Sequence, residues 1–100
     1  IVSNCQAGYI ELTMKCLGIE EYITDFECPG YTGLPKGENC KLVMERNGFK
    51  SAVYVGDTQG DGEASAFAGI PFVYCAYGFG SPKTYDYKIE KFSELLELLL

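Results

Sequence analysis

Two aspartates, Asp57 and Asp61, stand four residues apart in the segment Val-Tyr-Val-Gly-Asp-Thr-Gln-Gly-Asp. The apolar residues before Asp57 predict a strand, and Asp61 falls in the first turn of a predicted helix, so the two carboxylates should lie close together. Neighbouring carboxylates repel each other unless a cation lies between them, and their oxygens are the ligands that Mg²⁺ prefers. The pair therefore predicts a magnesium site that can hold a substrate phosphate.

The same segment fits two other interpretations. Thr58 can cap the helix while Asp61 completes a capping box and favours the positive end of the helix dipole. Asp57 is then the firmer metal ligand, because it precedes the cap and has no evident structural task. A calcium-binding loop is disfavoured, since the acidic or amide residues at alternate positions and the closing glutamate are missing.

A second polar pair, Ser3 and Asn4, directly follows the apolar residues Ile1 and Val2. A strand commonly has about five residues, so we expect these two to end a strand that begins earlier, and the chain to be part of a longer protein. In an open α/β sheet, ligands bind at the carboxyl ends of the strands. Ser3, Asn4 and Asp57 are therefore expected at the same edge of one sheet.

Helices and strands are predicted to alternate along the chain. Apolar residues at helical spacing, ended in each case by a glycine, predict helices at residues 8–17, 36–47 and 59–68, with a short turn at 20–23. Short β-rich runs predict strands at residues 26–28, 52–55, 70–76 and 87–89, with a glycine-rich loop at 29–33. The expected buried faces contain Ile10, Met14 and Leu17 in the first helix, Cys40, Val43 and Met44 in the second, and Phe92, Leu95, Leu96 and Leu99 in a last helix. This order predicts one α/β domain over residues 1–100, with a parallel sheet flanked by helices.

The composition excludes several classes of protein. Fourteen acidic residues against eight basic ones give a net charge of -6, which disfavours nucleic acid and anionic membranes, because both are bound by clustered Lys and Arg. No segment approaches the roughly 20 apolar residues needed to span a bilayer. The five cysteines form no closely spaced pair and there is no histidine. This disfavours zinc and a disulfide scaffold, and favours buried, reduced thiols in a cytoplasmic protein.

The segment VYVGDTQGDGEASAFAGIPFVYCAYGFG, from Val53 to Gly80, closely resembles the haloacid dehalogenase (HAD) superfamily of phosphohydrolases, and within it the phosphoglycolate-phosphatase-like branch. The resemblance includes the GDxxxD signature, the helix end from Ala68 to Pro71, the following strand and the loop from Tyr77 to Gly80. It extends over essentially all 100 residues. It implies the C-terminal part of a Rossmann-like core of that superfamily.

The resemblance also implies roles for single residues. Ser3 matches the hydroxyl residue that hydrogen-bonds the transferring phosphoryl group, with Asn4 beside it as a second phosphate contact. Lys36, which follows Gly-Leu-Pro, matches the lysine that neutralises phosphate charge, and Lys41 is a rival for that role. The implied Mg²⁺ ligands are Asp57 and, as a supporting carboxylate, Asp61.

The nucleophile of the superfamily is an aspartate in a DxDGT-type signature, which this chain lacks. The resemblance therefore implies an N-terminal segment, in the same protein or a second chain, that carries the nucleophile, the cap and the central strand of the sheet. The expected function is hydrolysis of a small phosphorylated metabolite through an aspartyl-phosphate, with this chain inactive alone. One alternative is a non-catalytic metal- or phosphate-binding module. A receiver-like signalling domain is less favoured, because it needs an acidic pair after its first strand.

Overall fold

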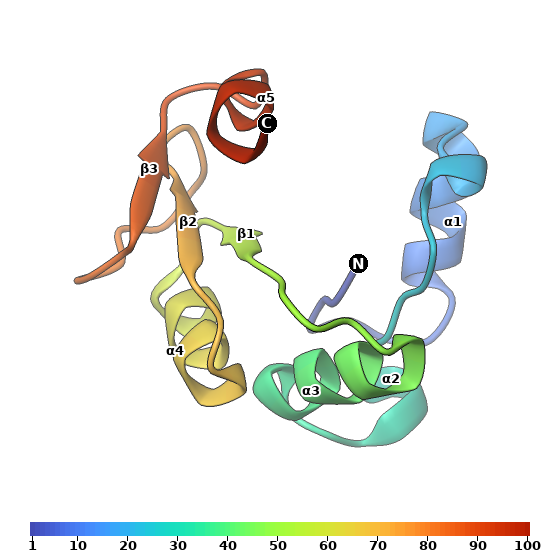
Figure 1. Ribbon diagram of the computed structural model, residues 1–100. Coiled ribbons are helices and arrows are strands. Elements are labelled where there is room, and N and C mark those ends of the chain that lie inside the picture. Colours follow the sequence, from blue (N-terminus) through green and yellow to red (C-terminus); the bar gives the residue numbers. More distant parts are fainter. The chain divides into compact units, whose positions relative to one another are not determined.

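The computed structural model describes all residues of the chain, 1–100, and divides into two units (Figure 1). The first unit runs from Ile1 to Phe49 and the second from Lys50 to Leu100. None of the helices is both long and apolar enough to cross a membrane.

The first unit contains three α-helices and one 3₁₀ turn. Its elements are α1 (Tyr9–Leu17), the turn η1 (Glu20–Tyr22), α2 (Pro29–Thr32) and α3 (Lys36–Asn47). The helices predicted at residues 8–17 and 36–47 are confirmed to within one residue. Gly18 and Gly48 follow α1 and α3 with φ of 66° and 67°, the left-handed conformation that makes glycine the preferred residue at a helix end.

Residues 29–32 form the short helix α2, within the segment 29–33 that is predicted as a loop. Pro29 is the first residue of this helix, where its fixed φ suits the helix and its missing N–H is not needed. Gly33 ends the helix with a φ of 71°. The Pro-Gly pair at its start therefore begins a helical turn here instead of stopping the chain from forming one.

The strand predicted at residues 26–28 is reduced to a single parallel bridge between Val2 and Glu27. The Glu27 N–H donates to the Ile1 carbonyl at 2.9 Å, and the Ser3 N–H donates to the Glu27 carbonyl at 3.3 Å. This short ladder places Ser3 directly after the paired segment, as expected for a residue at the end of a strand.

The core of the first unit lies between α1 and the segment around Cys28. Ile10 and Met14 of α1 are buried against Cys28, and four half-buried residues pack around them: Cys5, Ile19, Ile23 and Phe26. Leu17, predicted to share this buried face, is 66% exposed because it is the last residue of α1 and extends beyond the packed turns. In α3, Cys40 and Val43 are buried and Met44 is half-buried, which confirms the predicted face.

The five cysteines are all free thiols. Cys28, Cys40 and Cys75 are buried and Cys5 is half-buried, whereas Cys16 is exposed. The prediction of buried thiols is wrong for Cys16, because this residue lies about 200° around α1 from the buried Met14.

Arg46, near the end of α3, binds two acidic residues of the segment that pairs with Val2. Its Nε and Nη2 donate to the two carboxylate oxygens of Asp25, each at 2.9 Å, and its Nη1 donates to Glu27 Oε2 at 2.9 Å. Asn47 Nδ2 adds a 2.6 Å hydrogen bond to Asp25. The hydrogen bonds from Arg46 are the largest cause that lowers the pKa of Asp25, and those from Asn47 and the Phe26 N–H act in the same direction. Together they outweigh burial, which raises this pKa, and bring it to about 2.

We expect this network to make the stability of the protein depend on acid pH. The pKa of the Asp25 carboxyl is lowered from 3.8 to about 2 on folding, so its contribution is complete above pH 3.8 and is lost as the pH falls through about 2. Arg46→Met should lower the urea midpoint at pH 7, and its difference from the unchanged protein should shrink towards pH 2. Urea titrations followed by circular dichroism at both pH values measure this.

Lys88→Met is the matched control for that experiment. Lys88 pairs with Glu90 at 3.1 Å, and both side chains are exposed, so loss of this pair should change the midpoint little. Equal midpoints for Arg46→Met and Lys88→Met at pH 7 would contradict a stabilising role of the Asp25–Arg46 network.

The second unit is a three-stranded parallel sheet with two helices. Its strands are β1 (Tyr54–Gly56), β2 (Phe72–Cys75) and β3 (Tyr87–Ile89), in the order β1-β2-β3 (Figure 1). Helix α4 (Gln59–Ala68) connects β1 to β2, and α5 (Glu94–Leu99) follows β3. The predicted parallel sheet and the helix at residues 59–68 are confirmed. The strand predicted at residues 52–55 begins two residues later and includes Gly56.

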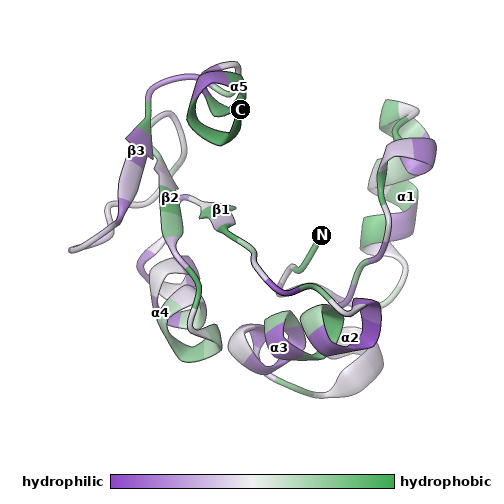
Figure 2. Ribbon diagram, in the orientation of Figure 1, coloured by the Kyte–Doolittle hydropathy of each residue, from purple (hydrophilic) through white to green (hydrophobic).

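The two helices cover opposite faces of this sheet. Successive side chains of a strand point to opposite faces, so Val73 and Cys75 share one face, where they form a buried cluster with Ile89 against which Leu95 of α5 packs. Phe72 points to the other face, where its ring lies 3.3 Å from the position that a Cβ of Gly62 in α4 would occupy. Figure 2 shows part of β2, the strand between these helices, in the green of hydrophobic residues.

Helix α5 packs through only one residue of its predicted apolar face. Leu95 is half-buried, but Phe92, Leu96 and Leu99 are each more than half exposed. The helix has six residues, so it contacts the sheet of its own unit through little more than one turn. The prediction that all four apolar residues are buried is therefore wrong, and much of α5 presents hydrophobic residues to solvent (Figure 2).

β1 is an edge strand, since β2 is its only hydrogen-bonded neighbour. An edge strand is the place where a sheet can accept a further strand. This position is compatible with the expectation that the central strand of the complete sheet belongs to a segment outside this chain.

Candidate functional site

Asp57 lies at the carboxyl end of the sheet in the second unit. β1 ends at Gly56, and α4 begins at Gln59 with Thr58 as its N-cap. The strand therefore brings Asp57 to the edge at which open α/β sheets bind ligands. The Asp57 side chain is half-buried.

Asp61 is buried, with 5% exposure, and forms a capping box with Thr58. The Asp61 N–H donates to Thr58 Oγ1 at 3.1 Å, while Asp61 Oδ2 accepts from the N–H groups of Asp57 at 2.9 Å and Thr58 at 3.1 Å. A Cβ at Gly56 would lie 2.5 Å from the same oxygen, so glycine is required there by close approach. The capping role predicted for Asp61 is confirmed, and its role as a metal ligand stays a prediction.

The Asp57 carboxylate fits one corner of a magnesium site. Its Oδ2 accepts a 2.7 Å hydrogen bond from the Phe79 N–H, which leaves Oδ1 for a cation. No group of three or more Asp, Glu, His or Cys side chains converges in a way that could hold a metal ion. Protein-bound Mg²⁺ commonly has one or two carboxylate ligands and completes its octahedron with waters and substrate phosphate. Asp57 is therefore suited to be one ligand of such a site and not the whole of it.

Tyr77, in the loop after β2, is not arranged as a general base. A hydrogen bond to the Cys75 thiol is the largest cause that raises the pKa of Tyr77 to about 12, and burial and the negative charge of Asp57 act in the same direction. The Tyr77 hydroxyl therefore stays protonated at physiological pH, where it can donate a hydrogen bond.

Ser3 and Asn4 follow the short ladder of the first unit, with Ser3 half-buried and Asn4 exposed. Ser3 lines a cavity of about 270 Å³ together with Ile1, Cys5, Tyr9, Ile10 and Thr13. Burial is the main cause that raises the pKa of the Cys5 thiol in this cavity. The thiol is therefore protonated at neutral pH and is a poor nucleophile. The role of Ser3 as a phosphate contact stays a prediction.

Lys36 is the first residue of α3, with Pro35 as the N-cap. A lysine at this end of a helix faces the positive pole of the dipole, so helix stability does not explain its presence. Lys41, the rival candidate, lies in the middle of the same helix and is exposed, whereas Lys36 is half-buried. Of the two lysines, Lys36 has the position of a residue that meets an anion at a helix N-terminus.

Asn39 fixes the loop that precedes Lys36, a role that the sequence analysis missed. Its side chain is fully buried. The Thr32 hydroxyl donates to Asn39 Oδ1 at 2.7 Å, and Asn39 Nδ2 donates to the Leu34 carbonyl at 3.1 Å. The available signal was a polar residue on the buried face of α3, four positions before Val43.

The structure brings two of the predicted site residues into contact, and the convergence of the others with them stays a prediction. Asp57 and Asp61 meet in the second unit through the hydrogen bond between the Asp57 N–H and Asp61 Oδ2. Ser3, Asn4 and Lys36 belong to the first unit. Their convergence with Asp57 on one phosphate stays a prediction.

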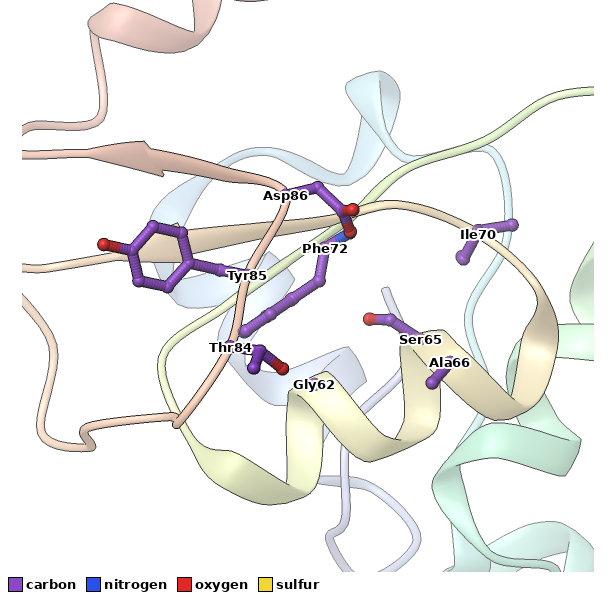
Figure 3. Close-up of a pocket in the computed structure, with 8 residues that line it drawn as sticks. All are labelled: Gly62, Ser65, Ala66, Ile70, Phe72, Thr84, Tyr85 and Asp86. Carbon is purple, nitrogen blue, oxygen red and sulfur yellow. The ribbon is translucent and has the colours of Figure 1, made fainter.

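A different cavity, of about 140 Å³, lies at the amino ends of β2 and β3 (Figure 3). It is lined by Gly62, Ser65, Ala66, Ile70, Phe72, Thr84, Tyr85 and Asp86. The Asp86 carboxylate accepts from the Phe72 N–H at 2.8 Å, and the Ser65 hydroxyl donates to the Asp61 carbonyl at 2.8 Å. Both polar groups thus serve the sheet and α4, and the cavity lies at the end of the sheet opposite to Asp57.

Comparisons with known proteins find likeness at the level of structure. No protein-family model matches the chain, and no match is found among curated proteins. A HAD-superfamily hydrolase of subfamily IA, variant 1, from Geobacter sulfurreducens is similar with a TM-score of 0.81 and 22% identity, over 95% of this chain and 45% of that protein. A protein from Clostridium difficile, provisionally named a phosphatase, is similar with a TM-score of 0.84 and 21% identity, over 95% of this chain and 49% of that protein.

These similarities confirm the predicted fold. The chain is an α/β structure that matches the C-terminal part of a HAD-like, Rossmann-like core, and it spans slightly less than half the length of either protein. The predicted resemblance to the superfamily, made from the segment around Asp57, is thus confirmed as a likeness of fold.

Proposed function

We propose that this chain is the C-terminal part of the core of a Mg²⁺-dependent phosphomonoester hydrolase. The observation that carries the proposal is the Asp57 carboxylate, placed after an edge strand and held at Oδ2 by the Phe79 N–H. A fold shared with a HAD-superfamily hydrolase supports it. The proposed location is the cytoplasm.

In the proposed reaction, an aspartate from a segment outside these 100 residues attacks the phosphorus of a phosphomonoester. The alcohol leaves, an aspartyl-phosphate forms, and water then hydrolyses it to inorganic phosphate and the free carboxylate. Bound Mg²⁺ would neutralise charge on the phosphate oxygens. Asp57 would be its ligand from this chain. Asp61 would support the turn that carries Asp57 and would add a negative charge near the metal.

The remaining predicted residues bind the phosphate in this proposal. Lys36 supplies a positive charge at a helix N-terminus, and Ser3 and Asn4 donate hydrogen bonds to phosphate oxygens. Substrates are expected to be small phosphorylated metabolites. The cap that would select among them belongs, in this proposal, to the same outside segment as the nucleophile.

A non-catalytic metal- or phosphate-binding module is the alternative. One observation favours it: Asp61, the second predicted metal ligand, is buried in a capping box with Thr58. In that case, Asp61 acts as a helix cap, and the chain functions by binding.

Hydrolysis of p-nitrophenyl phosphate separates these functions. We expect Mg²⁺-dependent turnover by the complete protein, none by the 100-residue chain alone, and recovery when the segment with the nucleophile is added. Turnover by the purified chain alone would show that the nucleophile is not outside it. A complete protein inactive with Mg²⁺ on a panel of phosphomonoesters would favour the binding module.

A further inference from the structure

The loop that follows β2, from Tyr77 to Gly80, packs directly on Asp57. The Phe79 N–H donates to Asp57 Oδ2 at 2.7 Å, a short distance that is typical of a hydrogen bond to an ionised carboxylate. The loop and Asp57 are 22 residues apart in the sequence. They meet because β1 and β2 are neighbours whose carboxyl ends lie at the same edge of the sheet.

Two glycines allow this contact. A Cβ at Gly78 would lie 2.3 Å from Asp57 Cβ and 2.5 Å from Asp57 Oδ2, and a Cβ at Gly80 would lie 2.4 Å from the Asp57 carbonyl oxygen. Neither glycine has a positive φ, so backbone conformation does not demand glycine at either position. Glycine is needed at both positions because each lies too close to Asp57 to carry a Cβ atom.

The loop is held by its backbone and not by the aromatic ring beside the contact. The Gly78 N–H donates to the Cys75 carbonyl at 3.0 Å, and the Tyr74 hydroxyl donates to the Gly80 carbonyl at 2.9 Å. The Phe79 side chain is fully exposed, at 104%. Packing of the Phe79 ring therefore does not explain where its N–H lies.

We propose that the Phe79 N–H is a positioning group for the Asp57 carboxylate, made possible by Gly78 and Gly80. By holding Oδ2, it fixes the orientation of the carboxylate and presents Oδ1 to a cation. Hydrogen bonds of this kind orient metal ligands, and their loss commonly weakens metal binding about 10- to 100-fold. The inference rests on the proposed function, because it assumes that Asp57 binds Mg²⁺.

Gly78→Ala in the complete protein tests the metal-binding consequence. The added methyl group must displace the Asp57 side chain, so Mg²⁺ affinity measured by calorimetry should fall about 10-fold. The Mg²⁺ concentration for half-maximal activity should rise by the same factor, with much of kcat recovered at saturating Mg²⁺. Phe79→Ala removes the ring and keeps the N–H, so it should bind Mg²⁺ as the unchanged protein does.

Gly69→Ala is the matched control. Gly69 has a φ of +74° and nothing within 4 Å of its Cβ position, so alanine there strains the backbone without touching Asp57. Its Mg²⁺ affinity should be unchanged. Equal Mg²⁺ affinities for Gly78→Ala and Gly69→Ala would overturn the inference.

Amide hydrogen exchange in the metal-free protein gives a second readout that does not depend on activity. The Phe79 amide should exchange slowly although its side chain is fully exposed, and Asp57→Ala should speed its exchange about 10-fold or more, because a hydrogen bond to a charged acceptor is lost. Equal exchange rates in the two proteins would overturn the inference, even where Gly78→Ala fails to fold.

The two proposals fail in different ways. If Asp57→Asn leaves Mg²⁺ affinity unchanged, Asp57 is not a metal ligand. The proposed function and the inference are then both wrong. If Asp57→Asn weakens Mg²⁺ binding and Gly78→Ala does not, the proposed function stands and only the inference is wrong.

Discussion

Asp57→Asn is expected to lower both Mg²⁺ affinity and kcat/KM of the complete protein by at least about 100-fold. The substitution removes the negative charge and replaces one carboxylate oxygen by an amide nitrogen, which cannot bind a cation. The asparagine oxygen can still accept the hydrogen bond that Phe79 now donates to Oδ2. The fold should therefore persist while the metal site is lost.

Mg²⁺ titrations by calorimetry and steady-state kinetics measure the effect, with Glu63→Gln as the control. Glu63 is exposed on α4, the helix that follows Asp57, so its replacement removes one charge from the same unit without changing a predicted ligand. Mg²⁺ affinity of Asp57→Asn equal to that of Glu63→Gln would rule out Asp57 as the metal ligand.

The elements around Asp57 could be predicted because their signals are local. Thr58 and Asp61 have the spacing of a capping box, and Gly69 ends the helix that this box begins. The apolar runs before Asp57 and after Gly69 are not alternating, as is typical of parallel strands covered on both faces. The fold class follows from this order of elements, and the comparisons with solved structures agree with it.

The contact between Phe79 and Asp57 could not be predicted in this way. It depends on which strands are neighbours and on where a loop 22 residues away turns, and neither is encoded locally. The glycines at 78 and 80 were visible in the sequence, but most glycines in loops serve a turn conformation. Only the distances from their Cβ positions to Asp57 show that these two serve close approach.

The errors in the sequence analysis have the same origin. Amphipathic spacing identifies the apolar face of α5 but not the surface that covers it. Within its unit, only Leu95 of this face packs against the buried cluster of the sheet. Pro29 and Gly30 are common in loops, yet a proline also suits the first position of a helix, and here α2 results. In the first case the sequence does not show how much of an apolar helix face will be covered, and in the second it allows either a loop or a helical turn.

Asp61→Ala is expected to destabilise the protein by about 2–3 kcal/mol, because two backbone N–H groups lose a charged acceptor at a buried position. Both bonds, from Asp57 and Thr58, end on the same oxygen, Oδ2. The single side-chain oxygen of asparagine can accept both, so Asp61→Asn should keep most of the stability that alanine loses. Urea unfolding of the two variants measures this difference.

The same pair of variants separates the two roles predicted for Asp61. If Asp61 only caps α4, Asp61→Asn should retain both stability and Mg²⁺ affinity. If it also supports the metal with its charge, Asp61→Asn should weaken Mg²⁺ binding while stability is retained. Thr58→Ala, which removes the other half of the capping box, is the control: it should cost about 1 kcal/mol of stability and leave the carboxylate in place. Equal stability of the alanine and asparagine variants at position 61 would contradict the capping role, because asparagine alone can replace the acceptor.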